Sequence, residues 1–335
     1  MQIQSVPQSI LFLLPFVLVT TIGYASHSAS LCNVRAVDHL IERRDPRMLL
    51  TFLKAAGWAT AVAGLVALGL AMTNHSVMVG APVWVAMLGG FLFGVGAAVN
   101  GGCSMSTLQR LADGYLPMLA TLLCFCIGSV LLVAFVGACG IRRSTTIETV
   151  WSMQMMNFTV LAALWIWAAF EIVRIVRRRF VAQPHALPAL LIGASGGLAF
   201  ALYGSWSYTN MLRSVSQGWW SGQIMSRPVQ ILLILALFAG MLVSAMRRRS
   251  GKWQFGNRAQ WRGAILGGTC MGIGGALLPG GNDTVLLVML PAQSTTGVLS
   301  YLSLLIGIAL VLFARRSRLR DRNIHQAVAE RAMDD

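Results

Sequence analysis

Long apolar stretches alternate with short polar and basic stretches along most of the chain. The stretches at 116–137, 153–172 and 231–245 come close to the roughly 20 apolar residues that an α-helix needs to cross a bilayer core. Similar stretches recur from Ile10 to the C-terminal tail. This pattern predicts an all-α polytopic membrane protein rather than a soluble domain with one large helical core.

Basic side chains set the expected topology, because they gather between the apolar stretches. The positive-inside rule assigns such clusters to the cytoplasm. The clusters are Arg35–Arg47, Arg174–Arg179, Arg247–Arg262 and Arg315–Arg322. Keeping them on one side of the cell (inner) membrane predicts about nine transmembrane helices, with the N-terminus outside, the C-terminus cytoplasmic, and external loops at Thr73–Ala81 and Ile141–Val150. The predicted spans are 8–32, 48–72, 82–112, 115–139, 151–173, 186–210, 228–246, 263–290 and 296–314.

Composition narrows the range of partners. Of the 335 residues, 56% are hydrophobic and only 11% are charged. Soluble domains carry roughly 25% charged residues. The net charge of +15 does not indicate binding to nucleic acid, because the basic residues are not interleaved with aromatic side chains. The sequence contains no GxxxxGK[ST] phosphate loop and no zinc-ligand spacing of its cysteines. We therefore expect a lipid bilayer as the surroundings, and neither a cofactor nor a metal.

Four predicted spans are interrupted by glycine or polar residues, which indicates broken half-helices that meet at membrane depth. Irregular backbone is tolerated there only where it is buried in protein or lines a cavity. A glycine-rich helix contact is the simpler alternative for any one interruption. The interruptions are 24–28, 100–104, 203–207 and 279–283.

An internal repeat links the two halves of the chain. The segment 93–103 aligns with 271–281 when 178 is added to each number (272 − 94 = 178), and this offset pairs Cys32 with Asn210. Equivalent spans are separated by an odd number of predicted crossings, so we expect an inverted repeat. Transporters of this design bind substrate near the midplane, between half-helices whose N-terminal dipoles favour an anion. Within one transmembrane domain, 1–335, we expect a first repeat, a connecting span with a basic loop, a second repeat and a cytoplasmic tail at 8–139, 140–185, 186–314 and 315–335.

Thiols, amides and a carboxylate at the interruptions are the candidates for contact with a solute. Cys103 follows two glycines at the predicted start of a half-helix, where the dipole favours an anionic sulfur; a small packing residue is the alternative. Asp283 is either a proton-binding or coupling carboxylate or one half of an ion pair. Asn282 either donates to an anion or caps a half-helix. The predicted pathway residues are Asn100, Gly102, Cys103, Ser104, Cys32, Asn210, Gly281, Asn282 and Asp283.

These motifs resemble those of the YeeE/YedE sulfur-transport family, which includes thiosulfate uptake proteins. The matching stretches are Ser28–Ala36, Phe93–Ser104, Arg110–Gly114 and Gly267–Asp283. The resemblance implies that Cys32 and Cys103 pass a sulfur anion inward through S–H contacts. Where the family pattern usually has a further cysteine, this chain has Gly281, so the exact solute stays open.

The function that the resemblance implies is a permease, not an enzyme, for thiosulfate or a related small sulfur anion or thiol. A cytoplasmic sulfurtransferase is a further partner to consider. The alternative is a membrane sulfur carrier or sulfurtransferase-like enzyme in which Cys103 becomes a persulfide. A transferase needs a base beside its thiol, and no histidine neighbours Cys103 in sequence.

Overall fold

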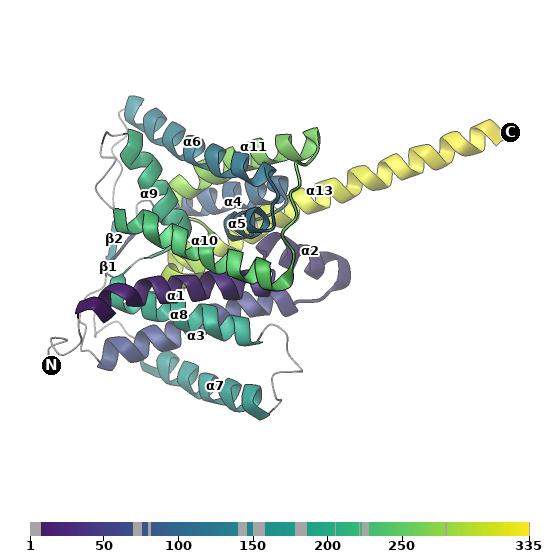
Figure 1. Cartoon of the computed structure of the whole chain (residues 1–335). Coiled ribbons are helices and arrows are strands. Elements are labelled where there is room, and N and C mark those ends of the chain that lie inside the picture. Colours follow the sequence, from purple (N-terminus) through teal and green to yellow (C-terminus); the bar gives the residue numbers. More distant parts are fainter. Residues whose placement is uncertain are drawn as a thin grey trace.

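A bundle of helices that run roughly side by side makes up most of the computed structural model (Figure 1). The structure describes residues 8–69, 76–79, 82–139, 146–149, 158–177, 186–204, 206–220, 222, 228–278 and 280–334.

The helices form two sets joined by one further helix. The first set is α1 (Gln8–Ser28), α2 (Asn33–Arg43), α3 (Arg47–Gly69), α4 (Val83–Asn100), α5 (Ser104–Ala112) and α6 (Pro117–Ala138). The joining helix is α7 (Phe158–Arg177). The second set is α8 (Ala186–Tyr203), α9 (Tyr208–Trp220), α10 (Pro228–Arg248), α11 (Arg258–Leu277), α12 (Asn282–Thr284) with the π-helical turn η2 (Val285–Met289), and α13 (Thr295–Asp334). Strands β1 (Ser76–Val79) and β2 (Thr146–Thr149) pair antiparallel.

The helices are apolar enough to identify a multi-pass membrane protein. In the described part of the chain, seven helical segments are long and apolar enough to cross a membrane, and α11 with α12 and η2, bent by 41°, makes an eighth. The prediction of nine spans is therefore approximate: α1 is not among the eight, although it packs against α8 and α10. Large apolar side chains such as Leu123 and Ile166 are exposed, as a surface in contact with lipid requires.

Breaks in the helices fall close to the predicted interruptions, with one correction. The chain leaves helical geometry at 101–103, at 204 and 206–207, and at 278 and 280–281, while Ser205 and Pro279 lie outside the described residues. The predicted interruption at 24–28 is wrong, because these residues form the last turn of α1 and the break follows at 29–32. The hydroxyls of Ser26 and Ser28 donate to carbonyls three residues earlier, both at 3.0 Å. These polar side chains are therefore satisfied within the helix.

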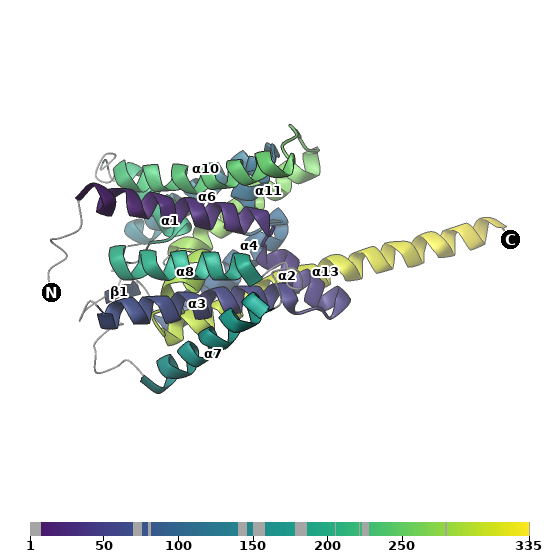
Figure 2. The same cartoon turned by 60° about the horizontal axis from the view of Figure 1, so that its bottom comes forward.

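Helices related by the offset of 178 make corresponding contacts. The offset carries the start of α5 at 104 to 282, the start of α12, and the start of α6 at 117 to 295, the start of α13. Helix α1 packs on α10 as α8 packs on α3, and α4 packs on α13 as α11 packs on α6. Figures 1 and 2 show α1 running toward the end of the bundle from which α13 projects, and α8 running away from it.

Glycines bring the backbones of α4 and α11 into direct contact. A Cβ on Gly96 would lie 2.7 Å from the carbonyl oxygen of Gly267, and a Cβ on Gly274 would lie 2.6 Å from that of Gly89. These two contacts exchange under the offset, since 89 + 178 = 267 and 96 + 178 = 274. Small residues allow membrane helices to gain van der Waals contact where no hydrophobic effect drives them together.

The ends of α2, α10 and α13 gather many of the basic residues at one end of the bundle, the basic end. Arg316 on α13 donates to Asp38 on α2 at 2.8 Å. Arg248 at the end of α10 donates to the Ser30 hydroxyl at 3.0 Å. Figure 1 shows α2 and the C-terminal end of α10 on the side of the bundle from which α13 projects.

The two-stranded sheet lies at the opposite end of the bundle (Figure 1). Its strands come from the two segments predicted as external loops, 73–81 and 141–150, and its register pairs Ser76 with Thr149. The sheet thus ties the connection between α3 and α4 to the connection between α6 and α7.

The joining helix α7 is attached to α3 through charged and aromatic side chains. Glu171, buried on α7, lies 2.5 Å from Lys54 Nζ on α3 and 3.5 Å from Arg174 Nε. Nearby, the rings of Trp58 and Trp167 lie 5.5 Å apart. A buried carboxylate in a membrane protein is stable only when it is paired, so the two cations make this charge tolerable.

Candidate functional site

A glycine turn connects α4 to α5 and positions Cys103. Gly101 has φ = 75°, a left-handed conformation that glycine adopts without strain. The Asn100 amide nitrogen donates to the Gly102 carbonyl at 2.9 Å and to the Thr107 hydroxyl at 3.1 Å. Asn100 Oδ1 accepts from Thr121 at 2.8 Å, so both ends of this side chain hold the turn in place.

Two buried thiols lie side by side where α2 and α5 begin. Cys32 and Cys103 occupy the N-cap positions of these helices and are 5% and 1% exposed. The Cys103 sulfur accepts hydrogen bonds from the backbone N–H groups of Asn33 and Ser106 and contacts the Cys32 thiol. Cys32 Sγ in turn lies 3.4 Å from Ser106 Oγ. Free N–H groups at two helix N-termini therefore point at the pair of sulfurs, where they favour negative charge.

Buried polar groups without a hydrogen-bond partner accompany the thiols. Asn33 is completely buried, yet neither polar atom of its side chain has a partner among the described residues. The Tyr301 hydroxyl, which interacts electrostatically with Cys103, likewise has none. Since an unpaired buried polar group costs about 1–3 kcal/mol, such a cluster is typical of a place that receives a polar ligand.

The start of α12 meets the start of α5. Ser104 Oγ donates to Asn282 Oδ1 at 2.8 Å, and the two residues are 178 positions apart. The pairing of these two sequence-predicted residues shows that the equivalent breaks of the two sets come together inside the bundle.

Asp283 accepts hydrogen bonds at the start of α9 and caps this helix. Its carboxylate accepts from the Thr209 backbone N–H at 3.0 Å and from the Thr209 hydroxyl. Next to it, the hydroxyls of Ser207 and Thr284 lie 2.6 Å apart. No ion pair with Asp283 is found in the part of the chain that the structure describes. The sequence left open whether this carboxylate binds a proton or coupling ion or forms an ion pair. Among the described residues it forms no ion pair, and it caps a helix instead.

Gly281 leaves no empty space at the position of the missing cysteine. A Cβ there would lie 2.8 Å from the Phe93 ring and 2.9 Å from Thr209 Oγ1. Asn210 lies in the first turn of α9, and among the described residues no hydrogen bond joins it to either thiol. Its Oδ1 accepts from Arg213 at 2.8 Å.

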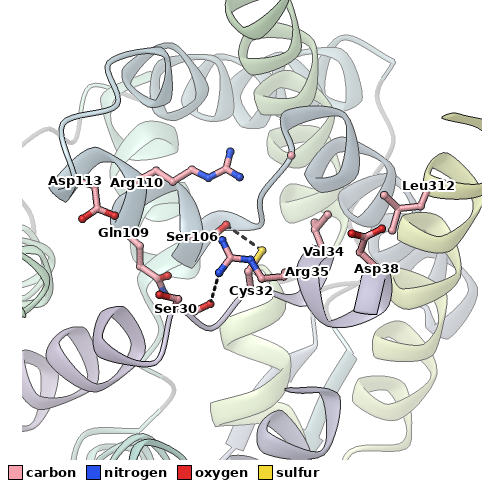
Figure 3. Close-up of a pocket in the computed structure, with 11 residues that line it drawn as sticks. Ser30, Cys32, Val34, Arg35, Asp38, Ser106, Gln109, Arg110, Asp113 and Leu312 are labelled. Atoms are coloured by element: carbon pink, nitrogen blue, oxygen red, sulfur yellow. Dashed lines mark hydrogen bonds between the residues drawn. The ribbon is translucent and has the colours of Figure 1, made fainter. Parts of the chain in front are cut away.

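A pocket of about 220 Å³ opens from Cys32 toward the basic end (Figure 3). One face of α5 lines it through Ser106, Gln109, Arg110 and Asp113, and Arg35 lies across from that face. The sequence interpretation assigned no role to these α5 residues. Their spacing of i, i+3, i+4 and i+7 was nevertheless a readable signal of one polar helix face.

Membrane-crossing helices broken around a buried polar centre define a multi-pass membrane protein of the transport class. The chain belongs to the sulphur-transport family, YeeE/YedE, which matches residues 28–310. No curated protein is similar enough to the chain to be matched with it. The family and the helical fold together support a transporter of sulfur compounds.

Proposed function

We propose that this protein is a permease that moves thiosulfate or a related small sulfur anion across the cell inner membrane. The observation that carries the proposal is the pair of adjacent buried thiols, Cys32 and Cys103, at two convergent helix N-termini. Asn33 and Tyr301 beside them supply buried polar groups that lack partners among the described residues.

The proposed mechanism needs no reaction at the protein. Neutral thiols are weak donors that suit the soft, diffuse charge of a sulfur anion, and hydroxyl and amide groups supply harder donors. The N-termini of α2 and α5 add positive potential without a mobile counter-charge. The solute would exchange its hydration shell for these groups and leave through the pocket at the basic end.

We further propose that α1–α6 and α8–α13 are inverted repeats and that α7 supplies the odd crossing between them. The matching starts and contacts at the offset of 178 support this relation. The contact of Ser104 with Asn282, 178 positions away, supports an axis between the halves at this point. Transporters with such repeats open alternately to the two sides around a central site.

The basic end is proposed to face the cytoplasm, which places the start of α1 outside. Single cysteines at Val77 in β1 and at Arg248 in α10, in a cysteine-free background, should react with an impermeant maleimide from opposite sides. Labelling of both from the same side of intact cells contradicts the orientation.

Uptake of labelled thiosulfate, sulfite, sulfate and small thiols into proteoliposomes tests the function directly. We expect thiosulfate or a close relative to accumulate and empty liposomes to show none. A reconstituted, folded protein that moves no member of the panel contradicts the proposal.

The second candidate is a membrane sulfur carrier in which Cys103 forms a persulfide that a cytoplasmic sulfurtransferase receives. The adjacent Cys32 thiol favours it, since its S–H group can donate a hydrogen bond to the sulfur that Cys103 holds after it takes the sulfane sulfur of thiosulfate and releases sulfite. The groups that contact the Cys103 sulfur are backbone N–H groups and the Cys32 thiol. None of them is a side-chain base, which favours the permease. Mass spectrometry after exposure to substrate separates them, because a stable adduct of one sulfur atom on Cys103 indicates the carrier.

A further inference from the structure

Two arginines in the pocket at the basic end have no carboxylate partner among the described residues. Arg35 Nη1 reaches only the Ser30 carbonyl oxygen, at 3.5 Å. Arg110 lies over the glycine turn before Cys103, since a Cβ on Gly101 would be 3.6 Å from its Nη1. Both side chains line the pocket (Figure 3).

The two carboxylates that line the same pocket are already engaged by other groups. Asp38 accepts from Arg316 at 2.8 Å. Asp113 lies 3.1 Å from His27 Nε2 and accepts from the Ser250 hydroxyl. The lining therefore carries two guanidinium groups that make no ion pair with any carboxylate of the described chain.

The pocket reaches Cys32, one of the two thiols. Ser106 and Cys32 both line it, and their side chains are in contact at 3.4 Å. Figure 3 shows Arg35 and Arg110, from α2 and α5, with Ser106 and Cys32 between these helices. An anion that leaves the thiols toward the basic end therefore meets the arginines next.

We propose that Arg35 and Arg110 form a docking site for a tetrahedral sulfur oxyanion at the basic end of the pathway. The planar fork of a guanidinium matches the spacing of two oxyanion oxygens, and two such groups supply the charge that a dianion requires. The pocket volume of about 220 Å³ accommodates such an anion with some of its water. The identification of this ligand with the transported solute rests on the proposed function.

The test is equilibrium binding of radiolabelled thiosulfate and sulfate to the full-length protein in nanodiscs at fixed ionic strength. Arg35→Gln and Arg110→Gln should each weaken binding about tenfold, because each removes a charge-assisted hydrogen-bond donor. Arg35→Lys and Arg110→Lys should weaken it less, since they keep the charge and lose the fork. Arg43→Gln, an exposed arginine of α2 outside the pocket, is the matched control and should bind as wild type does.

Repeating the measurement in a Cys103→Ser background separates the docking site from the thiols, because the arginine dependence should persist there. Binding that is equal in wild type and both glutamine variants overturns the docking site, and thiosulfate uptake by the same wild-type protein would leave the proposed function standing. Arginine-dependent binding by a protein that transports no sulfur anion keeps the docking site and removes the function. Phosphate that competes as well as thiosulfate overturns the assignment to a sulfur oxyanion.

Discussion

The two sets of helices place different chemistry at equivalent helix starts. At the starts of α2 and α5, backbone N–H groups face the thiol side chains of Cys32 and Cys103. At the start of α9, the N–H group of Thr209 already faces the carboxylate of Asp283. An anion built into the protein uses the positive potential of its helix and leaves none for a solute. If the proposed repeat and anion site are right, a symmetric scaffold holds an asymmetric site, with the thiol side open to an anion and the carboxylate side closed to it.

Of the substitutions proposed, Cys103→Ser should have the largest effect, because it removes one of the two thiols at the starts of α2 and α5. The volume is nearly conserved and the site is polar, so the fold should persist. Loss of the soft donor should reduce the initial rate of thiosulfate uptake about tenfold or more, as expected when a hydrogen bond to an anion is weakened. Cys270→Ser on α11 is the matched control, since that cysteine is partly exposed within a helix and lies neither at a helix start nor in the pocket lining. Normal uptake by a well-folded Cys103→Ser protein removes this residue from the site.

Gly281→Cys tests whether the carboxylate side can be made to resemble the thiol side. The new Cβ would meet Phe93 and Thr209. Such overpacking should lower the free energy of unfolding by up to about 3 kcal/mol. Thermal unfolding in detergent measures this, and Gly281→Ala separates the cost of the Cβ from that of the sulfur. Adding Phe93→Leu should restore part of the loss. An unchanged midpoint for Gly281→Ala contradicts the packing described for this position.

Asp283→Asn replaces the built-in anion by a neutral amide of nearly the same shape. An amide nitrogen would then face one of the two Thr209 donors. One buried donor left unpaired should lower the free energy of unfolding by about 2 kcal/mol. Substrate half-saturation should stay near the wild-type value if the carboxylate acts as a cap. Glu42→Gln, an exposed carboxylate on α2, controls for the change in net charge. A large change in half-saturation with unchanged stability would return Asp283 to the pathway.

Ser104→Ala removes the contact that joins the two sides and should have the smallest effect. Hydrogen bonds between membrane helices contribute about 0.6 kcal/mol on average, so the unfolding midpoint should shift only slightly. A double-mutant cycle with Asn282→Ala isolates the pair from other losses. A coupling energy of zero would show that the two residues are neighbours without a bond that contributes to stability.

Glycine turns made much of the fold predictable from the sequence. Gly101 and Gly280 have φ of 75° and 124°. Few other residues adopt these conformations, so breaks there could be read directly. The serines near the end of α1 were misread as a break, because hydroxyls can also bond to carbonyls of their own helix. Composition alone does not distinguish these two uses of a polar residue.

The site was predictable only where the neighbours of a residue in the sequence indicate its role. Cys103 follows two glycines, and its position at a helix start was expected. Asp283 finds its partner, Thr209, 74 positions away along the chain, so its role as a cap required the tertiary structure. Among the described residues, the Asn33 side chain has no hydrogen-bond partner and Arg110 has no carboxylate partner. Both properties depend on the surroundings in space, which the spacing of residues along the chain does not reveal.

The contact between Ser104 and Asn282 has a mechanical consequence. In the proposed inverted repeat each residue is the equivalent of the other, because 104 + 178 = 282, and exchanging the two halves would map the contact onto itself. A point on a rotation axis stays still while everything around it turns. If the two halves exchange conformations, so that the pathway opens on one side of the membrane and closes on the other, this hydrogen bond serves as the pivot about which each half-helix rotates.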